Sequence, residues 1–151
     1  MAKRLFLPLS PARTDERPAV DAVRKRLGGR AATEEGAGEV VSFRDDRGFE
    51  RTGVVLFARG AEIDVWCEGD LVRRLRREEA RAADGALDAK VFEVSRDARA
   101  FAALGEGDRV RFQHTQGPGE GRLVEKCRFG GLVERADGSL LGVGFRRLQA
   151  V

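Results

Sequence analysis

The chain has 151 residues, of which 42% are hydrophobic and 35% are charged, so a packed core is expected and wholesale disorder is not. Its 28 basic and 25 acidic residues leave a net charge of +3, which excludes the one-sided charge of a protein that coats DNA. No apolar run reaches membrane-spanning length. We expect a cytoplasmic protein of one ordinary or two very small domains, with Cys67 and Cys127 reduced.

Residues 1–35 differ from the rest of the chain because three prolines interrupt a polar stretch. Pro18 suits the first turn of a helix, and apolar residues follow at helical spacing up to Gly28. The sequence predicts a flexible N-terminal arm with a short helix over 18–27. That helix either packs against the end of a barrel or binds a partner.

Two segments share the pattern Gly-x-Gly-acid-x-Val-x-Phe. The first begins at Gly36 and the second at Gly105, an offset of 69 residues (105 − 36). An acid–Gly pair followed by apolar residues recurs at the same offset, at Gly69 and Gly138. An internal repeat of this kind predicts two similar structural units.

The first unit is predicted over 36–83. Its strand-length apolar runs are separated by turn residues such as Asp45-Asp46-Arg47-Gly48, and Phe49 and Phe57 are expected in the core. The good helix formers of 76–83 predict a helix after the last strand. The predicted strands lie around Val41–Phe43, Gly53–Phe57, Ile63–Cys67 and Leu71–Val72.

A linker is predicted over 84–104, with a short strand over Val91–Val94 and a helix capped by Ser95. The second unit is predicted over 105–151. Asp137-Gly138 is its clearest hairpin turn, and Gly117-Pro118-Gly119 is expected to form a looser loop. The predicted strands of this unit are Val110–Phe112, Leu123–Phe129, Leu132–Glu134 and Leu140–Phe145.

Segments Gly38–Leu75 and Gly107–Leu148 resemble the small SH3-like β-barrels of the Tudor and KOW type. Those families commonly show a Gly-acid-x-Val entry, a central Gly-rich hairpin and a final strand that ends near a basic pair. The resemblance implies a mainly β fold class, with two small antiparallel SH3-like barrels in tandem. Short helices would lie in the linker and in the N-terminal arm.

Trp66 is the only tryptophan and the first candidate for a partner-binding site. Period-two alternation places Ile63, Val65 and Cys67 on one face of their strand and Trp66 with Asp64 on the other. If the apolar triplet faces the core, Trp66 is partly exposed and marks a recognition surface. The alternative is that Trp66 is buried between the two barrels.

The other candidate site residues are basic. On a regular strand, Arg122, Lys126 and Arg128 would project from one face and, with further arginines, form a basic stripe. The stripe could contact phosphates or an acidic partner, whereas the interspersed acids favour a merely solvated face. The remaining members of the predicted stripe are Arg73, Arg74, Arg76, Arg77, Arg146 and Arg147.

The sequence lacks a recognisable catalytic constellation. His114 is the lone histidine and has no cysteine at metal-ligand spacing. The glycines from Gly117 to Gly121 lack the Lys-Ser/Thr of a phosphate-binding loop. No carboxylate pair or activated nucleophile is evident. The sequence therefore predicts a non-enzyme that binds neither a cofactor nor a metal.

Residues 91–148 also resemble the tail of PilZ domains, which bind cyclic di-GMP. Arg73-x-x-x-Arg77 or Arg77-x-x-x-Arg81 could supply that family's first nucleotide-binding element. The second element would be Glu93–Ala98, in which Glu replaces an Asp or Asn and Ala replaces a Gly. This resemblance implies a regulator with a degenerate nucleotide-binding motif.

A further resemblance is to the cold-shock barrel. Gly38–Phe49 resembles the first strand of that family, and Leu104–Phe112 resembles its last third. The paired aromatic strands on which nucleic-acid bases stack are absent.

The function predicted from these observations is that of a cytoplasmic protein–protein adaptor or regulatory subunit that docks on a larger complex. One alternative is a nucleic-acid-associated factor of the transcription or translation type, which would use the arginine stripe. A second alternative is the PilZ-like regulator. A membrane is not expected among the partners.

Overall fold

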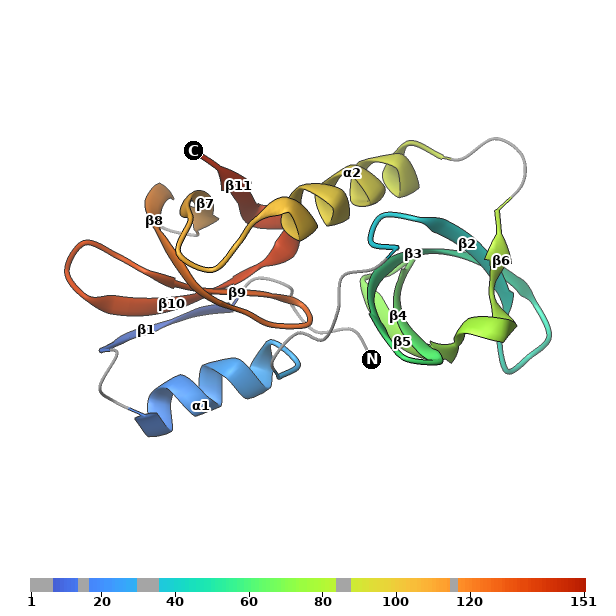
Figure 1. The fold of residues 1–151 in the computed structure, drawn as a ribbon, viewed down its shortest axis with the longest axis horizontal. Coiled ribbons are helices and arrows are strands. Elements are labelled where there is room, and N and C mark those ends of the chain that lie inside the picture. The colour runs from blue at the N-terminus through green and yellow to red at the C-terminus, as the bar shows by residue number, and fades with distance from the viewer. Residues whose placement is uncertain (1–6, 14–16, 30–35, 84–87, 115–116) are drawn as a thin grey trace. The chain divides into compact units, whose positions relative to one another are not determined.

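The computed structural model describes residues 7–13, 17–29, 36–83, 88–114 and 117–151 (Figure 1). Its fold is mainly β, with two antiparallel sheets and two α-helices, so the expected β class and the presence of short helices are confirmed. The chain divides into two compact units. The first unit contains Ala32–Arg99, and the second combines Arg4–Ala31 with Ala100–Val151.

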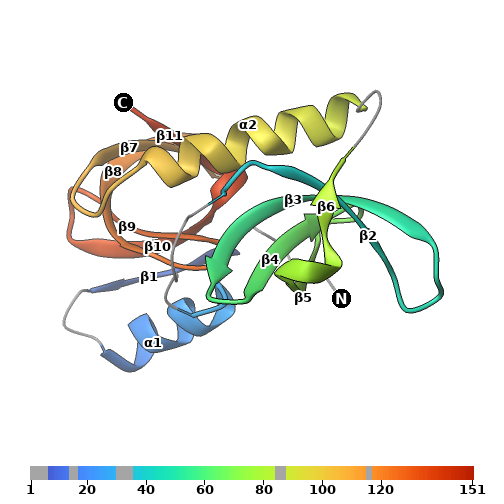
Figure 2. The same cartoon turned by 45° about the vertical axis from the view of Figure 1, so that its right-hand side comes forward.

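The sheet of the first unit has five strands in the order β5-β4-β3-β2-β6. It is strongly curved (Figure 2), and a bulge interrupts the pairing of β3 with β4 between Val55 and Phe57. Val41 and Phe43 point into its core, as their alternation predicts. The strands are β2 (Val40–Arg44), β3 (Glu50–Arg59), β4 (Glu62–Cys67), β5 (Leu71–Arg76) and β6 (Arg81–Ala82).

The sheet of the second unit has six strands in the order β1-β10-β9-β8-β7-β11. The helix α1 (Arg17–Arg26) confirms the helix predicted over 18–27. It packs Val23 and Leu27 against Cys127 and Leu132. The strands are β1 (Leu7–Arg13), β7 (Arg109–His114), β8 (Gly117–Lys126), β9 (Gly130–Glu134), β10 (Ser139–Gly144) and β11 (Leu148–Ala150).

The two sheets have the same construction once β1 is set aside. The order β6-β2-β3-β4-β5 corresponds to β11-β7-β8-β9-β10, and in each unit a 3₁₀ helix joins the last two strands. These helices are η1 (Arg77–Glu79) and η2 (Phe145–Arg147). In each unit the short last strand returns to pair with the first, which brings the curved sheet towards closure.

Individual backbone contacts also recur at equivalent positions. A bulge follows Val55 in β3 and Leu123 in β8, 68 residues further along (123 − 55). The hydrogen bond from the Val55 N–H to Glu39 O in the first unit recurs in the second unit as the bond from the Leu123 N–H to Asp108 O. Likewise, the bond from the Arg77 N–H to Ala61 O recurs as the bond from the Phe145 N–H to Phe129 O. The match between the two units therefore extends to single turns and bulges.

Gly53 in β3 and Gly121 in β8 occupy equivalent positions where the next strand approaches closely. A Cβ on Gly53 would collide with Val65 Cγ1 and lie 2.7 Å from the carbonyl oxygen of Trp66. A Cβ on Gly121 would lie 2.6 Å from Val133 Cγ1 and 2.5 Å from the carbonyl oxygen of Glu134. Only glycine fits at either position, because backbone atoms of the neighbouring strand cannot move aside.

The helix predicted over 76–83 is wrong. Only Arg77–Glu79 form a 3₁₀ turn, and the chain then extends into β6. Arg81 and Ala82 pair there with Ser42 and Val41 of β2. The tertiary pairing of the strand thus overrides the local helix propensity.

The predicted strand over 91–94 is also wrong, because one helix, α2 (Ala89–Ala103), includes these residues. Asp88 caps this helix through a 2.8 Å hydrogen bond that its Oδ1 accepts from the Val91 N–H. Ser95, the expected cap, lies inside α2 and donates from Oγ to the carbonyl oxygen of Gly38 at 2.6 Å.

Two further elements differ from the expectation. Gly117–Gly119 is not a loop but the beginning of β8, where Pro118 lies opposite Gln113. The strand β1 was not predicted. It pairs with β10, so this part of the predicted N-terminal arm belongs to the second sheet.

Replacing Gly53 or Gly121 with alanine should lower the free energy of unfolding by about 1–3 kcal/mol, because the new methyl group overlaps atoms of the next strand. Urea unfolding followed by circular dichroism measures the change. Gly105→Ala is the matched control, since its Cβ would meet nothing closer than 3.7 Å. Equal stability of Gly105→Ala and Gly53→Ala would contradict the close approach.

Candidate partner-binding surfaces

Trp66 and Asp64 are both buried, with Trp66 only 1% exposed. The Trp66 Nε1 donates to Asp70 Oδ1 at 3.0 Å, and Arg74 Nε donates to Asp64 Oδ1 at 3.2 Å. The interpretation that Trp66 is partly exposed is therefore wrong. The reason is that β4 is buried on both faces from Ile63 to Cys67, so alternation along it does not separate a core face from a solvent face.

The three basic residues around β8 do not form a stripe. The bulge between Leu123 and Glu125 shifts the alternation by one residue. Arg122 consequently points outward and pairs with Glu134 at 3.0 Å, whereas Lys126 is buried. Arg128 lies beyond the end of β8, where its guanidinium stacks on the ring of Phe129.

Lys126 caps the C-terminal end of α2. Its Nζ donates to the carbonyl oxygens of Phe101 and Leu104 at 2.7 Å each and of Ala102 at 3.3 Å. It also lies 4.7 Å from the centroid of the Phe101 ring. The last carbonyls of a helix have no partner within the helix, and the negative end of its dipole favours a cation. Within the second unit, Lys126 therefore performs a structural task.

The remaining arginines of the predicted stripe divide between the two units. Arg73, Arg74, Arg76 and Arg77 follow one another along β5 and η1 in the first unit. Arg74 pairs with Asp64, as above, and Arg76 lies 3.7 Å from Glu78. Arg73 and Arg77 form no ion pair with the residues that the structure describes. Arg146 and Arg147 lie on η2 of the second unit.

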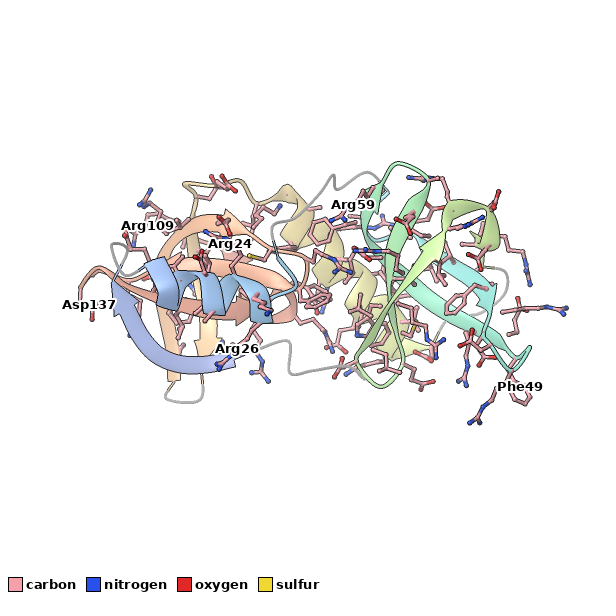
Figure 3. All side chains as sticks on the ribbon, turned by 90° about the horizontal axis from the view of Figure 1, so that it is seen from below. Arg24, Arg26, Phe49, Arg59, Arg109 and Asp137 are labelled. Carbon is pink, nitrogen blue, oxygen red and sulfur yellow. The ribbon has the colours of Figure 1, made fainter. Side chains whose placement is uncertain are left out.

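The hairpin between β2 and β3 presents an aromatic side chain that the sequence placed in the core. Asp45 Oδ1 accepts the N–H groups of Arg47 and Phe49 at 2.9 and 3.0 Å, and Asp45 Oδ2 accepts Arg51 Nε at 2.7 Å. The hydrogen bond from Arg51 is the main cause that lowers the pKa of Asp45. Phe49 is 60% exposed and projects from this hairpin (Figure 3).

The turn at 45–48 is thus as predicted, but Phe49 is not in the core. The sequence pattern shows that Phe49 follows a turn. It does not show that this turn places the ring outside the sheet. A second exposed aromatic residue, Phe92, is 68% exposed on α2. The sequence does not predict this exposure, because it predicts a strand over 91–94.

The first unit also has a pocket of about 280 Å³. Cations and anions are mixed in its lining, which includes Arg51, Arg73, Glu50, Glu68 and Asp88. Cys67 also lines this pocket, and burial raises the pKa of its thiol from 9.0 to about 11. A thiol with that pKa is a poor nucleophile at neutral pH.

No protein-family model matches the chain, and no curated protein matches it. Among the described residues, no group of three or more His, Cys, Asp or Glu side chains could hold a metal ion. In the same part of the chain, no helix is long and apolar enough to cross a membrane.

Replacing Lys126 with methionine should lower the free energy of unfolding by about 1.5–3 kcal/mol, because the carbonyls at the end of α2 lose a charged donor. Arg122→Met is the matched control on the same strand. Its ion pair with Glu134 is exposed, and its loss should cost less than about 1 kcal/mol. Thermal and urea unfolding measure both changes, and equal losses would refute the capping role of Lys126.

Burial of the Cys67 thiol predicts a pH-dependent stability. Because its pKa is higher in the folded chain, the protonated thiol contributes stability that is complete below about pH 9 and is lost as the pH rises from 9 to 11. The difference in unfolding free energy between the wild type and Cys67→Ala should therefore shrink over that range. Urea unfolding at pH 8 and pH 10.5 measures it. A difference that grows with pH would show the opposite shift.

Proposed function

We propose that this chain is a non-enzymatic binding module of two SH3-like barrels in tandem, and that it docks on a partner protein. The barrel assignment is supported by the shared construction of the two sheets. In each, the strands follow one another antiparallel, and a 3₁₀ helix leads into a short last strand that pairs with the first. Small barrels of this kind reduce the length of their exposed edges through curvature and partial closure.

Several basic residues are paired with carboxylates or buried, and this observation favours a protein partner over a nucleic acid. Phosphate binding requires unneutralised cations gathered on one surface. Here Arg74, Arg76 and Arg122 lie beside carboxylates, and Lys126 is buried against helix carbonyls. The bulge in β8 also removes the regular alternation that a basic stripe needs.

Phe49 provides an anchor for such a partner. Its hairpin is held by three hydrogen bonds to the carboxylate of Asp45, so the ring is presented on an ordered turn. An exposed aromatic side chain on a rigid support loses little conformational freedom on binding and buries a large apolar area. Arginine neighbours such as Arg47 supply the polar contacts that usually surround such an anchor.

An affinity pull-down from native lysate, with and without nuclease, tests the proposal. Captured proteins should persist after nuclease treatment and decrease with Phe49→Ala. Phe92→Ala is the matched control, because it removes an equally exposed ring from a helix.

Fluorescence anisotropy with single-stranded and duplex RNA and DNA complements the pull-down. We expect no binding that weakens steeply between 50 and 200 mM salt. If such binding is found, or if the captured proteins vanish with nuclease, the alternative of a nucleic-acid-associated factor replaces the adaptor. A parallel titration with cyclic di-GMP tests the PilZ-like alternative, which saturable binding of the nucleotide would favour.

A further inference from the structure

The equivalent strands β5 and β10 differ at their outer edges. In the second unit, β1 covers the edge of β10, with Leu7 opposite Gly142 and Ala12 opposite Leu140. In the first unit, β5 is the last strand of the sheet, and no described strand pairs with its outer edge. The two strands also differ in burial. Every residue of β10 is buried, whereas every residue of β5 is half-buried or exposed.

The backbone groups that face outward from β5 can be assigned from one hydrogen bond. The Arg77 N–H donates to the carbonyl oxygen of Ala61, on the side of β4. Because N–H direction alternates along an antiparallel strand, the N–H groups of Val72, Arg74 and Arg76 point away from β4. Val72 and Arg74 correspond to Leu140 and Gly142, the residues that β1 pairs with in the second unit.

An acidic side chain already occupies one of these outward donors. Glu79 Oε1 accepts the Arg76 N–H at 2.9 Å, which closes that end of the edge. The outward N–H and C=O groups of Val72 and Arg74 have no such partner among the described residues. They therefore form a short open edge, bounded by the η1 turn on one side and by Asp70 on the other.

The charges of this edge select its partner. Arg73 lies on β5 and Arg77 on the adjoining η1, and neither forms an ion pair with the residues that the structure describes, so an incoming strand with acidic residues is attracted. A second copy of the chain that paired edge to edge would place these arginines against one another, which disfavours a homodimer through β5. The half-buried Leu71, Val72 and Leu75 add apolar contact beside the charges.

We propose that the outer edge of β5 receives an extended acidic segment of a partner protein as an added antiparallel strand, in the position that β1 takes on β10. Main-chain hydrogen bonds to Val72 and Arg74 would provide affinity, and the arginines would provide selectivity. This inference rests on the proposed protein-binding function and specifies where and how one partner segment binds.

The direct test uses a blocked ten-residue peptide of alternating threonine and glutamate, and a threonine–lysine peptide as its control. The glutamate peptide should bind the full chain and the lysine peptide should not. Amide hydrogen exchange by NMR should show new protection at Val72 and Arg74 on binding. The Arg76 amide, already bonded to Glu79, should change little. Binding that leaves Val72 and Arg74 unprotected, or no binding at millimolar peptide, would overturn the proposal.

A variant pair isolates the main-chain contribution. Val72→Pro removes one outward N–H but none of those that point to β4, and proline is tolerated on edge strands. It should weaken binding of the glutamate peptide about two- to tenfold, the effect of one lost hydrogen bond of ordinary net strength. Val72→Thr should bind like the wild type. If Val72→Pro is folded and binds the glutamate peptide as tightly as the wild type does, strand addition is refuted. If that variant unfolds, the hydrogen-exchange measurement on the wild type decides whether a strand is added.

The two proposals can fail separately. If the wild type captures nuclease-resistant protein partners and Val72→Pro captures them equally well, strand addition at β5 is wrong and the adaptor function stands. If the wild type captures no protein, or only nuclease-sensitive material, the adaptor function itself fails.

Discussion

The close approach of neighbouring strands at Gly53 and Gly121 is the constraint on which both sheets depend. At each position the space that a Cβ would need is filled by a backbone carbonyl oxygen and by a valine methyl group of the next strand. The long strands β3 and β8 can curve there, and the bulges after Val55 and Leu123 add to the bend. Without that curvature, the short last strand of each unit could not return to pair with the first.

The same construction carries different side chains where the two units have different tasks. Lys126, which caps α2 in the second unit, corresponds to Ala58 in the first, where the position belongs to the apolar core. The pairing partners correspond as well, since Ala58 lies opposite Ile63 and Lys126 opposite Gly131. The cation is thus a local adaptation to the helix that ends above it, which explains why it does not contribute to a basic surface.

The sequence predicted those parts of the structure whose physics is local. The turn at Asp45–Gly48, the Asp137-Gly138 hairpin, helix α1 and most strands depend on neighbouring residues, and all of them are confirmed. The errors involve distant contacts. The pairing of β6 with β2 overrides helix propensity, and a single bulge turns Lys126 inward. Trp66 is hidden because β4 is buried on both faces, which no pattern within the strand reveals.

The edges of the two sheets show how one scaffold can manage exposed strands in two ways. An open edge invites unwanted pairing, and proteins commonly cover it or charge it. In the second unit, β1 covers the edge of β10. In the first unit the edge is charged, since Arg73, Arg74 and Arg76 lie on β5 and Arg77 follows it. Charge does not abolish pairing, because it excludes only strands of like sign. The device that protects β5 from another copy of the chain is therefore the same one that selects an acidic strand, and protection and recognition at this edge have one physical cause.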